Sequence, residues 1–169
     1  MGYYKGQSSI ERVSIIMKFL HEKLYFYYIA LKTEFVSFET YKIWLNRVFL
    51  DSNSSDDVFL ELQFCTHSLE ETIKKLYIYL YDKVNSIDYH VVMKMIITEL
   101  KMQYDNETAL CEITRKLYNI WRLLPIEVSS EKPFLILNSI DDPWSWKGRE
   151  DIIEIIDNLL NYYDSTDEK

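Results

Sequence analysis

Apolar residues recur every three or four positions along most of this 169-residue chain, and this spacing constrains the fold more than any other feature of the sequence. In an α-helix such residues line up on one face, so each run of them predicts an amphipathic helix that buries that face. The chain has only three glycines and three prolines, too few for the many tight turns of a sandwich of strands. The sequence therefore predicts an all-α fold.

Six to seven helices are expected, packed as a bundle or as an irregular orthogonal array. They are predicted from Ser8 or Ser9 to Leu31, from Ser37 to about residue 50, over a short segment after Ser55, from Ser68 to Leu80, from Ser86 or Asp88 to Leu100, from Leu110 to Leu124, and from Asp142 to about Tyr163. Ser68 and Glu71 have the spacing of a capping box. Pro125 ends the helix before it. Beyond it, the apolar run Phe134 to Leu137 predicts one short extended segment near residues 133–138, laid against the core or forming a lone strand.

The length of the chain fits one helical domain over residues 1–163, followed by a polar tail over 164–169. Hydrophobic residues make up 48% of the sequence, enough for a core without metals or disulfides. Cys65 and Cys111 are too few and too isolated for a disulfide framework, and indicate small buried hydrophobes in a reducing compartment. No apolar run approaches the roughly 18 residues that cross a bilayer, and no signal peptide is recognised, so a cytoplasmic location is expected.

The formal net charge of −8 is spread unevenly along the chain. Residues 1–50 carry a net charge of +3, residues 51–137 carry −5, and residues 138–169 carry −6. An acidic surface repels nucleic acid and anionic membranes, and it attracts basic proteins and speeds their encounter. The alternative is that the charge serves only solubility.

Motifs for common enzymatic chemistry are missing from the sequence. Its glycines, at positions 2, 6 and 148, cannot form a phosphate-binding loop, and neither the His-Glu-x-x-His motif of zinc proteases nor the Glu-x-x-His motif of di-iron bundles occurs. Cys65 and His67 lie close in sequence, but catalytic pairs are assembled by the fold and need a third orienting group. The sequence therefore predicts a non-enzymatic protein with no cofactor and no metal.

The last predicted helix has the most distinctive charge pattern. Glu150, Glu154 and Asp157 recur at steps of four and three, which places three carboxylates on one helical face. Like charges at this spacing destabilise a helix by a few tenths of a kcal/mol per pair, and a basic partner would relieve that repulsion. The stripe is therefore a candidate partner-binding surface, and an ordinary solvated face is the alternative.

Two further segments are candidate contacts. Trp144 and Trp146 lie in a polar turn beside Asp141 and Asp142, and aromatic residues beside carboxylates are typical of interface anchors. The alternative is that the two indoles tuck this turn onto the helices. A second acidic cluster, for which the same alternatives as for the last helix stay open, comprises Asp51, Asp56, Asp57 and Glu61.

A family resemblance rests on several short stretches of mostly apolar residues. They are Leu24-Tyr25, Val36-Ser37-Phe38, Asp56 to Leu62, Leu110 to Ile113, Leu117-Tyr118, Trp121 and Pro125. In this order they resemble an uncharacterised family of small acidic helical bacterial proteins associated with polymorphic and contact-dependent toxin systems. The resemblance covers residues 20–125, has no counterpart after Pro125, and transfers no functional residue. It implies an immunity protein that neutralises a cognate toxin.

Two hypotheses about function follow, beside a third, an enzyme of an unrecognised kind, which a polar pocket with perturbed carboxylates would support. The first is a non-enzymatic immunity protein that occludes the active surface of a basic, nuclease-like toxin, because nucleases present Lys and Arg to phosphates. Its partner-binding residues would be Glu150, Glu154, Asp157, Trp144, Trp146, Asp141, Asp142, Asp56 and Asp57. The alternative is a helical adaptor or viral-type regulator that takes a partner's amphipathic helix in a groove. Both hypotheses expect a protein partner, and neither expects nucleic acid or a membrane.

Overall fold

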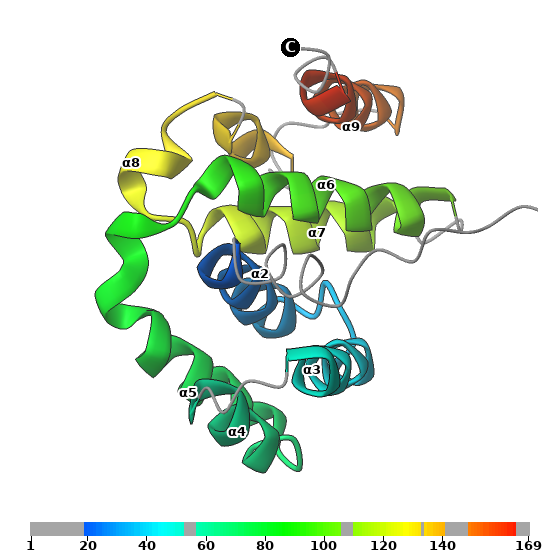
Figure 1. The fold of residues 1–169 in the computed structure, drawn as a ribbon. Helices are drawn as coiled ribbons and strands as arrows, with labels where there is room; N and C mark the ends of the chain where they lie inside the picture. The colour runs from blue at the N-terminus through cyan, green and yellow to red at the C-terminus, as the bar shows by residue number, and fades with distance from the viewer. Residues whose placement is uncertain (1–18, 53–56, 106–109, 133, 141–148, 165–169) are drawn as a thin grey trace, which may run out of the picture. The chain divides into compact units, whose positions relative to one another are not determined.

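The computed structural model describes residues 19–52, 57–105, 110–132, 134–140 and 149–164 (Figure 1). Within these ranges every regular element is helical and no strand occurs, which confirms the all-α prediction. Seven of the described helices have eight or more residues. The chain forms two compact units, unit 1 (Met1–Leu31 and Val36–Ile87) and unit 2 (Lys32–Phe35 and Asp88–Lys169). The single helical domain expected from chain length stays a prediction.

Unit 1 is a succession of packed helices. Its described elements are α2 (Leu20–Lys32), α3 (Phe38–Ser52), α4 (Asp57–Phe64), α5 (Leu69–Leu80) and the 3-10 helix η1 (Tyr81–Ser86). Helix α3 packs against α4, α4 packs against α5, and η1 continues directly from α5. The fully buried side chains of this unit include Leu24, Ile29, Tyr41, Leu45, Phe59, Leu62 and Leu76. Leu24, Tyr41, Leu45 and Leu76 among them occupy positions that the apolar spacing assigns to helix interiors.

Helix α2 is buried on almost all of its faces. Nine of its thirteen residues are buried, Glu22 among them. The ring of Tyr27 lies 4.5 Å from the Trp44 ring and 5.2 Å from the Tyr41 ring, centroid to centroid. A single apolar stripe would bury one side of a helix, so the stripe predicted for this segment understates the burial of α2.

Ser68 caps α5, as its spacing from Glu71 predicts. The Ser68 hydroxyl accepts a hydrogen bond from the backbone N–H of Glu71 at 3.3 Å. The backbone N–H of Ser68 donates to the carbonyl of Cys65 at 3.0 Å, and the Glu71 carboxylate pairs with Nε2 of His67 at 3.0 Å. Only one half of the predicted capping box is therefore formed, because the turn before α5 already supplies the partner for the Ser68 N–H.

Unit 2 contains the remaining described elements. They are α6 (Tyr89–Asp105), α7 (Leu110–Trp121), the single-turn helix α8 (Ile126–Ser129), the 3-10 helix η2 (Phe134–Ser139) and α9 (Arg149–Asp164). The carboxylate of Asp88 accepts from the backbone N–H groups of His90 at 2.9 Å and Val91 at 3.3 Å, so Asp88 starts α6. Helix α9 packs against α6 (Figure 1). It ends at Asp164, one residue beyond the predicted end.

The extended segment predicted near residues 133–138 is wrong. Residues Phe134–Ser139 form η2, which packs against α7 and α8. Phe134, Leu137 and Ile140 are buried at intervals of three, the period of a 3-10 helix, while Leu135 is exposed. With no strand among the described residues to pair with, an extended segment would leave its backbone polar groups without partners. Local bonds, such as the one from the Ile140 N–H to the Leu137 carbonyl, supply them.

Candidate functional site

Helix α9 carries the carboxylates that the sequence singles out. Glu154 and Asp157 are exposed, whereas Ile156 and Leu159 are buried. Because α9 packs against α6, its apolar side is used in the core of unit 2 and its acidic side faces solvent. Glu150 lies on the same helix, and its side chain is outside the described residues. No cation of the described part of the chain forms an ion pair with Glu154 or Asp157.

Most of the other predicted contact residues fall outside the described ranges. These are Asp56, Asp141, Asp142, Trp144 and Trp146. Asp57 is described and is exposed at the first position of α4. A carboxylate there complements the partial positive charge of the helix N-terminus. The structure therefore places the candidates Glu154 and Asp157 on one helix of unit 2 and Asp57 on a helix of unit 1.

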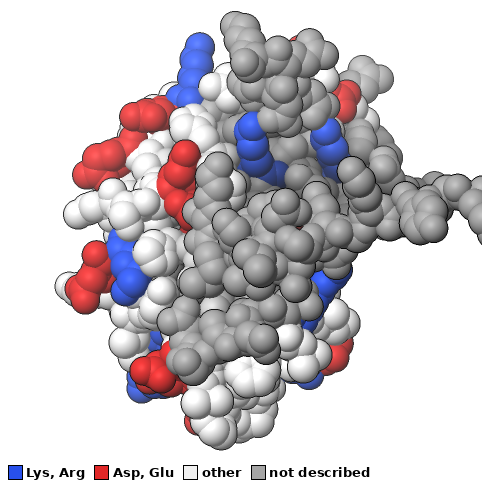
Figure 2. Space-filling model, in the orientation of Figure 1, with Lys and Arg blue, Asp and Glu red and all other residues white. Residues whose placement is uncertain are grey.

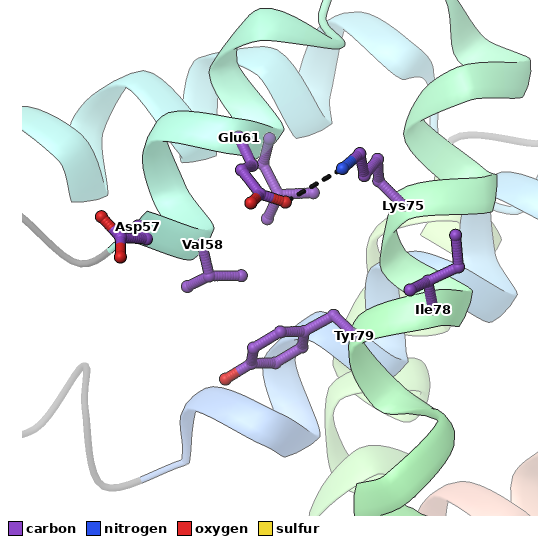
Figure 3. Close-up of a pocket in the computed structure, with 7 residues that line it drawn as sticks. Asp57, Val58, Glu61, Lys75, Ile78 and Tyr79 are labelled. Atoms are coloured by element: carbon purple, nitrogen blue, oxygen red, sulfur yellow. Dashed lines mark hydrogen bonds and ion pairs between the residues drawn. The ribbon is translucent and has the colours of Figure 1, made fainter.

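Helices α4 and α5 enclose a pocket of about 320 Å³ in unit 1 (Figure 3). Its lining combines apolar and charged side chains: Asp57, Val58, Glu61, Leu62, Lys75, Ile78 and Tyr79. The sequence does not predict this pocket, because its lining residues come from two helices and belong to no motif. Asp57 and Glu61 are four residues apart on α4 and both belong to the second acidic cluster.

One of the two carboxylates of the pocket is paired. Nζ of Lys75 lies 3.0 Å from Oε2 of Glu61, joining α5 to α4. This hydrogen bond and the charge of Glu61 raise the pKa of Lys75 above its ordinary value. No described cation forms an ion pair with Asp57. The pocket therefore holds two carboxylates and one ammonium group, a net single negative charge.

Cys65 and His67 do not form a catalytic pair. Cys65 is buried, whereas His67 is exposed. The expected burial of Cys111 is wrong, because Cys111 is exposed. Nδ1 of His67 lies 2.8 Å from the Phe64 carbonyl, and Nε2 lies 3.0 Å from the Glu71 carboxylate. Both ring nitrogens are engaged by groups other than the thiol, which fits the interpretation of a core cysteine beside a helix cap.

A cluster of exposed apolar side chains on α3 and α4 is not predicted from the sequence. Oδ1 of Asn46 accepts a hydrogen bond from Nε2 of Gln63 at 2.9 Å, where α3 meets α4. Ile43 and Leu50 lie about one turn to either side of Asn46, and Leu60 lies one turn before Gln63. The exposed fractions of the cluster are 62% for Ile43, 78% for Leu50, 46% for Leu60 and 72% for Phe64. On a helical wheel of α3, Ile43 and Leu50 lie away from the side that carries the buried residues. A helical wheel would therefore have indicated that these two apolar side chains are exposed.

Neither a metal site nor a membrane span occurs within the described part of the chain. Its residues form no group of three or more His, Cys, Asp or Glu placed to bind a metal ion. None of its helices combines the length and the apolar character of a membrane span. Acidic and basic side chains are interspersed on the face drawn in Figure 2.

No family model, curated protein or solved structure matches this chain.

Proposed function

We propose that this protein acts by binding another protein, and that the acidic side of α9 covers a basic surface of that partner. The observation that carries the proposal is that Glu154 and Asp157 are exposed without a described cationic partner. Glu150 belongs to the same sequence stripe. The family resemblance of residues 20–125 supports a cognate toxin as partner, so the proposed role is that of an immunity protein.

The chemistry of a nuclease makes it a suitable target. A nuclease presents Lys and Arg side chains to the phosphates of its substrate, so its active surface is positively charged. Carboxylates one helical turn apart repel each other in the free protein, and a cationic surface relieves this repulsion on binding. Complementary charge also speeds encounter, by roughly 10–10³-fold at low salt. The acidic stripe would therefore occupy the place of the nucleic-acid backbone.

The test is reversal of the stripe to lysine. Glu150, Glu154 and Asp157 are replaced together, and association with the protein encoded by the neighbouring gene is measured by surface plasmon resonance at low and high salt. The association rate constant is expected to fall at least about tenfold at low salt and to lose most of its salt dependence. Reversal of Glu34, Glu127 and Glu131, which are also exposed in unit 2, changes the net charge by the same amount and is the control. An equal loss in both variants, or no loss in the first, contradicts the assignment to α9.

The exposed apolar cluster favours a second candidate function. Leu50 of α3, one turn after Asn46, and Phe64 of α4, next to Gln63, are exposed near the Asn46–Gln63 hydrogen bond and offer apolar contacts. An amphipathic helix of a partner uses such contacts at spacings of three and four. Under this function, Leu50→Glu and Phe64→Glu abolish capture of the partner, whereas the reversal of α9 leaves it unchanged.

A further inference from the structure

Helix α7 of unit 2 carries two exposed arginines, Arg115 and Arg122. Neither forms an ion pair with a described residue. The carboxylate of the same helix, Glu112, lies 2.7 Å from Nζ of Lys116. Lys116 is the main cause that lowers the pKa of Glu112, and Arg115 is the least of the causes. Glu112 therefore belongs to Lys116, and the two guanidinium groups face solvent.

A half-buried tyrosine lies between the two arginines on the same side of α7. Arg115, Tyr118 and Arg122 follow one another at steps of three and four, so they line up along the helix. The Tyr118 ring stacks on the Trp121 ring at a centroid distance of 5.8 Å, and Nε1–H of Trp121 donates to the Ser129 carbonyl at 3.0 Å. Arg and Tyr are enriched in protein interfaces. With the exposed cysteine one turn earlier, these residues form the α7 stripe: Cys111, Arg115, Tyr118 and Arg122.

The chemistry of the α7 stripe selects carboxylates at a fixed spacing. Glu127 and Glu131, which follow α7, are exposed and weaken its long-range field, but the ion pairs among described residues include neither of them. An occupant in contact with the stripe therefore meets two guanidinium groups, each able to bind a carboxylate through two parallel hydrogen bonds. Arg115 and Arg122 are seven residues apart, about 10.5 Å along the helix axis.

Helix α9 carries carboxylates at this spacing. Its acidic side, the α9 stripe, consists of Glu150, Glu154, Asp157 and Asn161, at steps of four, three and four. The last three are exposed. The α7 stripe has the same three steps, so two helices that lie side by side bring the stripes into register position by position.

An antiparallel arrangement pairs the charges best. It places Arg115 opposite Asp157 and Arg122 opposite Glu150. A parallel arrangement places Arg122 opposite the uncharged Asn161, so only one arginine keeps a carboxylate. The other facing pairs of the antiparallel arrangement are Tyr118 with Glu154 and Cys111 with Asn161.

Within one chain the two stripes do not pair. No ion pair among the described residues joins α7 to α9, and α9 packs against α6 (Figure 1). Since each copy carries both stripes, a second copy supplies the charges that each stripe lacks. We propose that two copies of this chain associate through unit 2, with the α7 stripe of each lying antiparallel to the α9 stripe of the other. A two-fold dimer of this kind contains each contact twice.

The association is weak, because exposed ion pairs contribute only about 0.2–1 kcal/mol each and salt screens them. In the dimer the α9 stripe is covered, so a basic partner competes with the second copy for it. This goes beyond the proposed function, because it gives α7 a role and the dimer itself requires no toxin.

Sedimentation equilibrium of the full chain alone tests the association. The weight-average mass should rise from that of the monomer toward twice that value as the concentration approaches about 1 mM at low salt, and fall back at about 0.5 M salt. Replacing both Arg115 and Arg122 with glutamate should abolish the rise. Replacing Lys74 and Lys132 with glutamate is the matched control, because both lysines are exposed away from the two stripes and the net charge changes equally.

A charge swap tests which stripes meet. The second variant carries Glu150→Arg and Asp157→Arg, and it should be monomeric alone, as should the double arginine variant. An equimolar mixture of the two should associate, because each altered stripe then faces a stripe of opposite charge.

A cross-link tests the antiparallel register. In an Asn161→Cys variant the introduced thiol should face Cys111 of the other copy. Oxidised glutathione then joins the two sulfur atoms and leaves as two molecules of reduced glutathione, and a linked dimer appears on a non-reducing gel. Asn158→Cys, exposed on α9 but off the stripe, is the control and should form far less of it.

Several results would overturn the proposal: a monomeric mass at low salt, equal losses in the arginine and lysine variants, a mixture that stays monomeric, or equal cross-linking of the two cysteine variants. A monomer that binds an acidic peptide through α7 would also overturn it, by identifying another occupant. The double arginine variant keeps the α9 stripe intact and should bind a basic partner at least as fast as the wild type. A monomer that binds such a partner refutes only the dimer, and a dimer that binds none refutes only the proposed function.

Discussion

Replacing Tyr41 with phenylalanine removes one buried oxygen and leaves the aromatic core of unit 1 otherwise intact. The Tyr41 side chain is fully buried, and its ring lies 5.2 Å from the Tyr27 ring and 5.9 Å from the Trp44 ring, centroid to centroid. Among the described residues, no group forms a hydrogen bond with its hydroxyl. A buried hydroxyl without a partner has lost its water and gained nothing in exchange. Phenylalanine should therefore be the more stable residue at this position.

The expected gain follows from two opposing terms. Removing the hydroxyl recovers about 1–3 kcal/mol of desolvation free energy. It also forfeits the packing contacts of one atom, at roughly 0.1–0.2 kcal/mol for each contact. We expect Tyr41→Phe to raise the free energy of unfolding by about 1 kcal/mol, which corresponds to a Tm increase of about 2–4 °C for a chain of this size. Urea unfolding followed by far-ultraviolet circular dichroism measures the change, with the exposed Tyr81→Phe as control.

The same hydroxyl should make stability depend on pH under alkaline conditions. Burial is the largest cause that raises the pKa of Tyr41 above its ordinary value, and the nearby Cys65 and Tyr27 add to it. In the unfolded chain the phenol loses its proton near pH 10, while the folded protein keeps it. The folded state then binds more protons, so stability is complete below about pH 10 and falls above it by up to about 1.4 kcal/mol per pH unit. Tyr41→Phe should remove this part of the slope.

The opposite result would refute the reasoning about Tyr41. If Tyr41→Phe lowers the free energy of unfolding by about 1 kcal/mol or more, the hydroxyl is hydrogen-bonded in the folded protein, as a buried water would allow. An alkaline slope that is identical in the variant and the wild type would show that Tyr41 ionises as it does in the unfolded chain. A Tyr81→Phe effect beyond about 0.5 kcal/mol would show that the assay responds to tyrosine content rather than to burial.

Two further substitutions test the cap and the core. Ser68→Ala removes the acceptor for the Glu71 N–H and should lower the free energy of unfolding by about 1 kcal/mol; an unchanged urea midpoint would show that the cap contributes nothing. Leu117→Ala truncates a fully buried side chain of α7 and should cost about 2–5 kcal/mol in the same assay, and a cost below about 1 kcal/mol would contradict its placement in the core.

Local signals in the sequence predict much of the helical architecture. Tyr41, Leu45 and Val48 have helical spacing and are buried along α3. The start of α6 stayed open between Ser86 and Asp88 on sequence grounds, since both residue types cap helices. The structure settles it, because Asp88 accepts two backbone hydrogen bonds while the Ser86 hydroxyl donates to the carbonyl of Lys83. These features depend on residues within a few positions of each other, which is why the sequence carries them.

Features that depend on distant parts of the chain could not be predicted. A run of four apolar residues has no period, so Phe134 to Leu137 is equally compatible with a strand and with a short helix. Its partners in space decide between the two, and those partners are α7 and α8. The burial of Glu22 has the same origin, since nothing adjacent in sequence shows how many faces of α2 are covered.

The charges of the α4 pocket show why local charge alone does not identify a binding site. In the sequence Asp57 and Glu61 are equivalent members of one acidic cluster. Packing makes them different, because α5 brings Lys75 to Glu61 and no described cation to Asp57. Removing Glu61 would leave the Lys75 ammonium without its partner, whereas removing Asp57 would break no ion pair of the described residues. After α4 and α5 have formed the Lys75–Glu61 ion pair, the unpaired charge of this site is that of Asp57. This difference between the two carboxylates depends on how the helices pack, so the sequence alone does not give it.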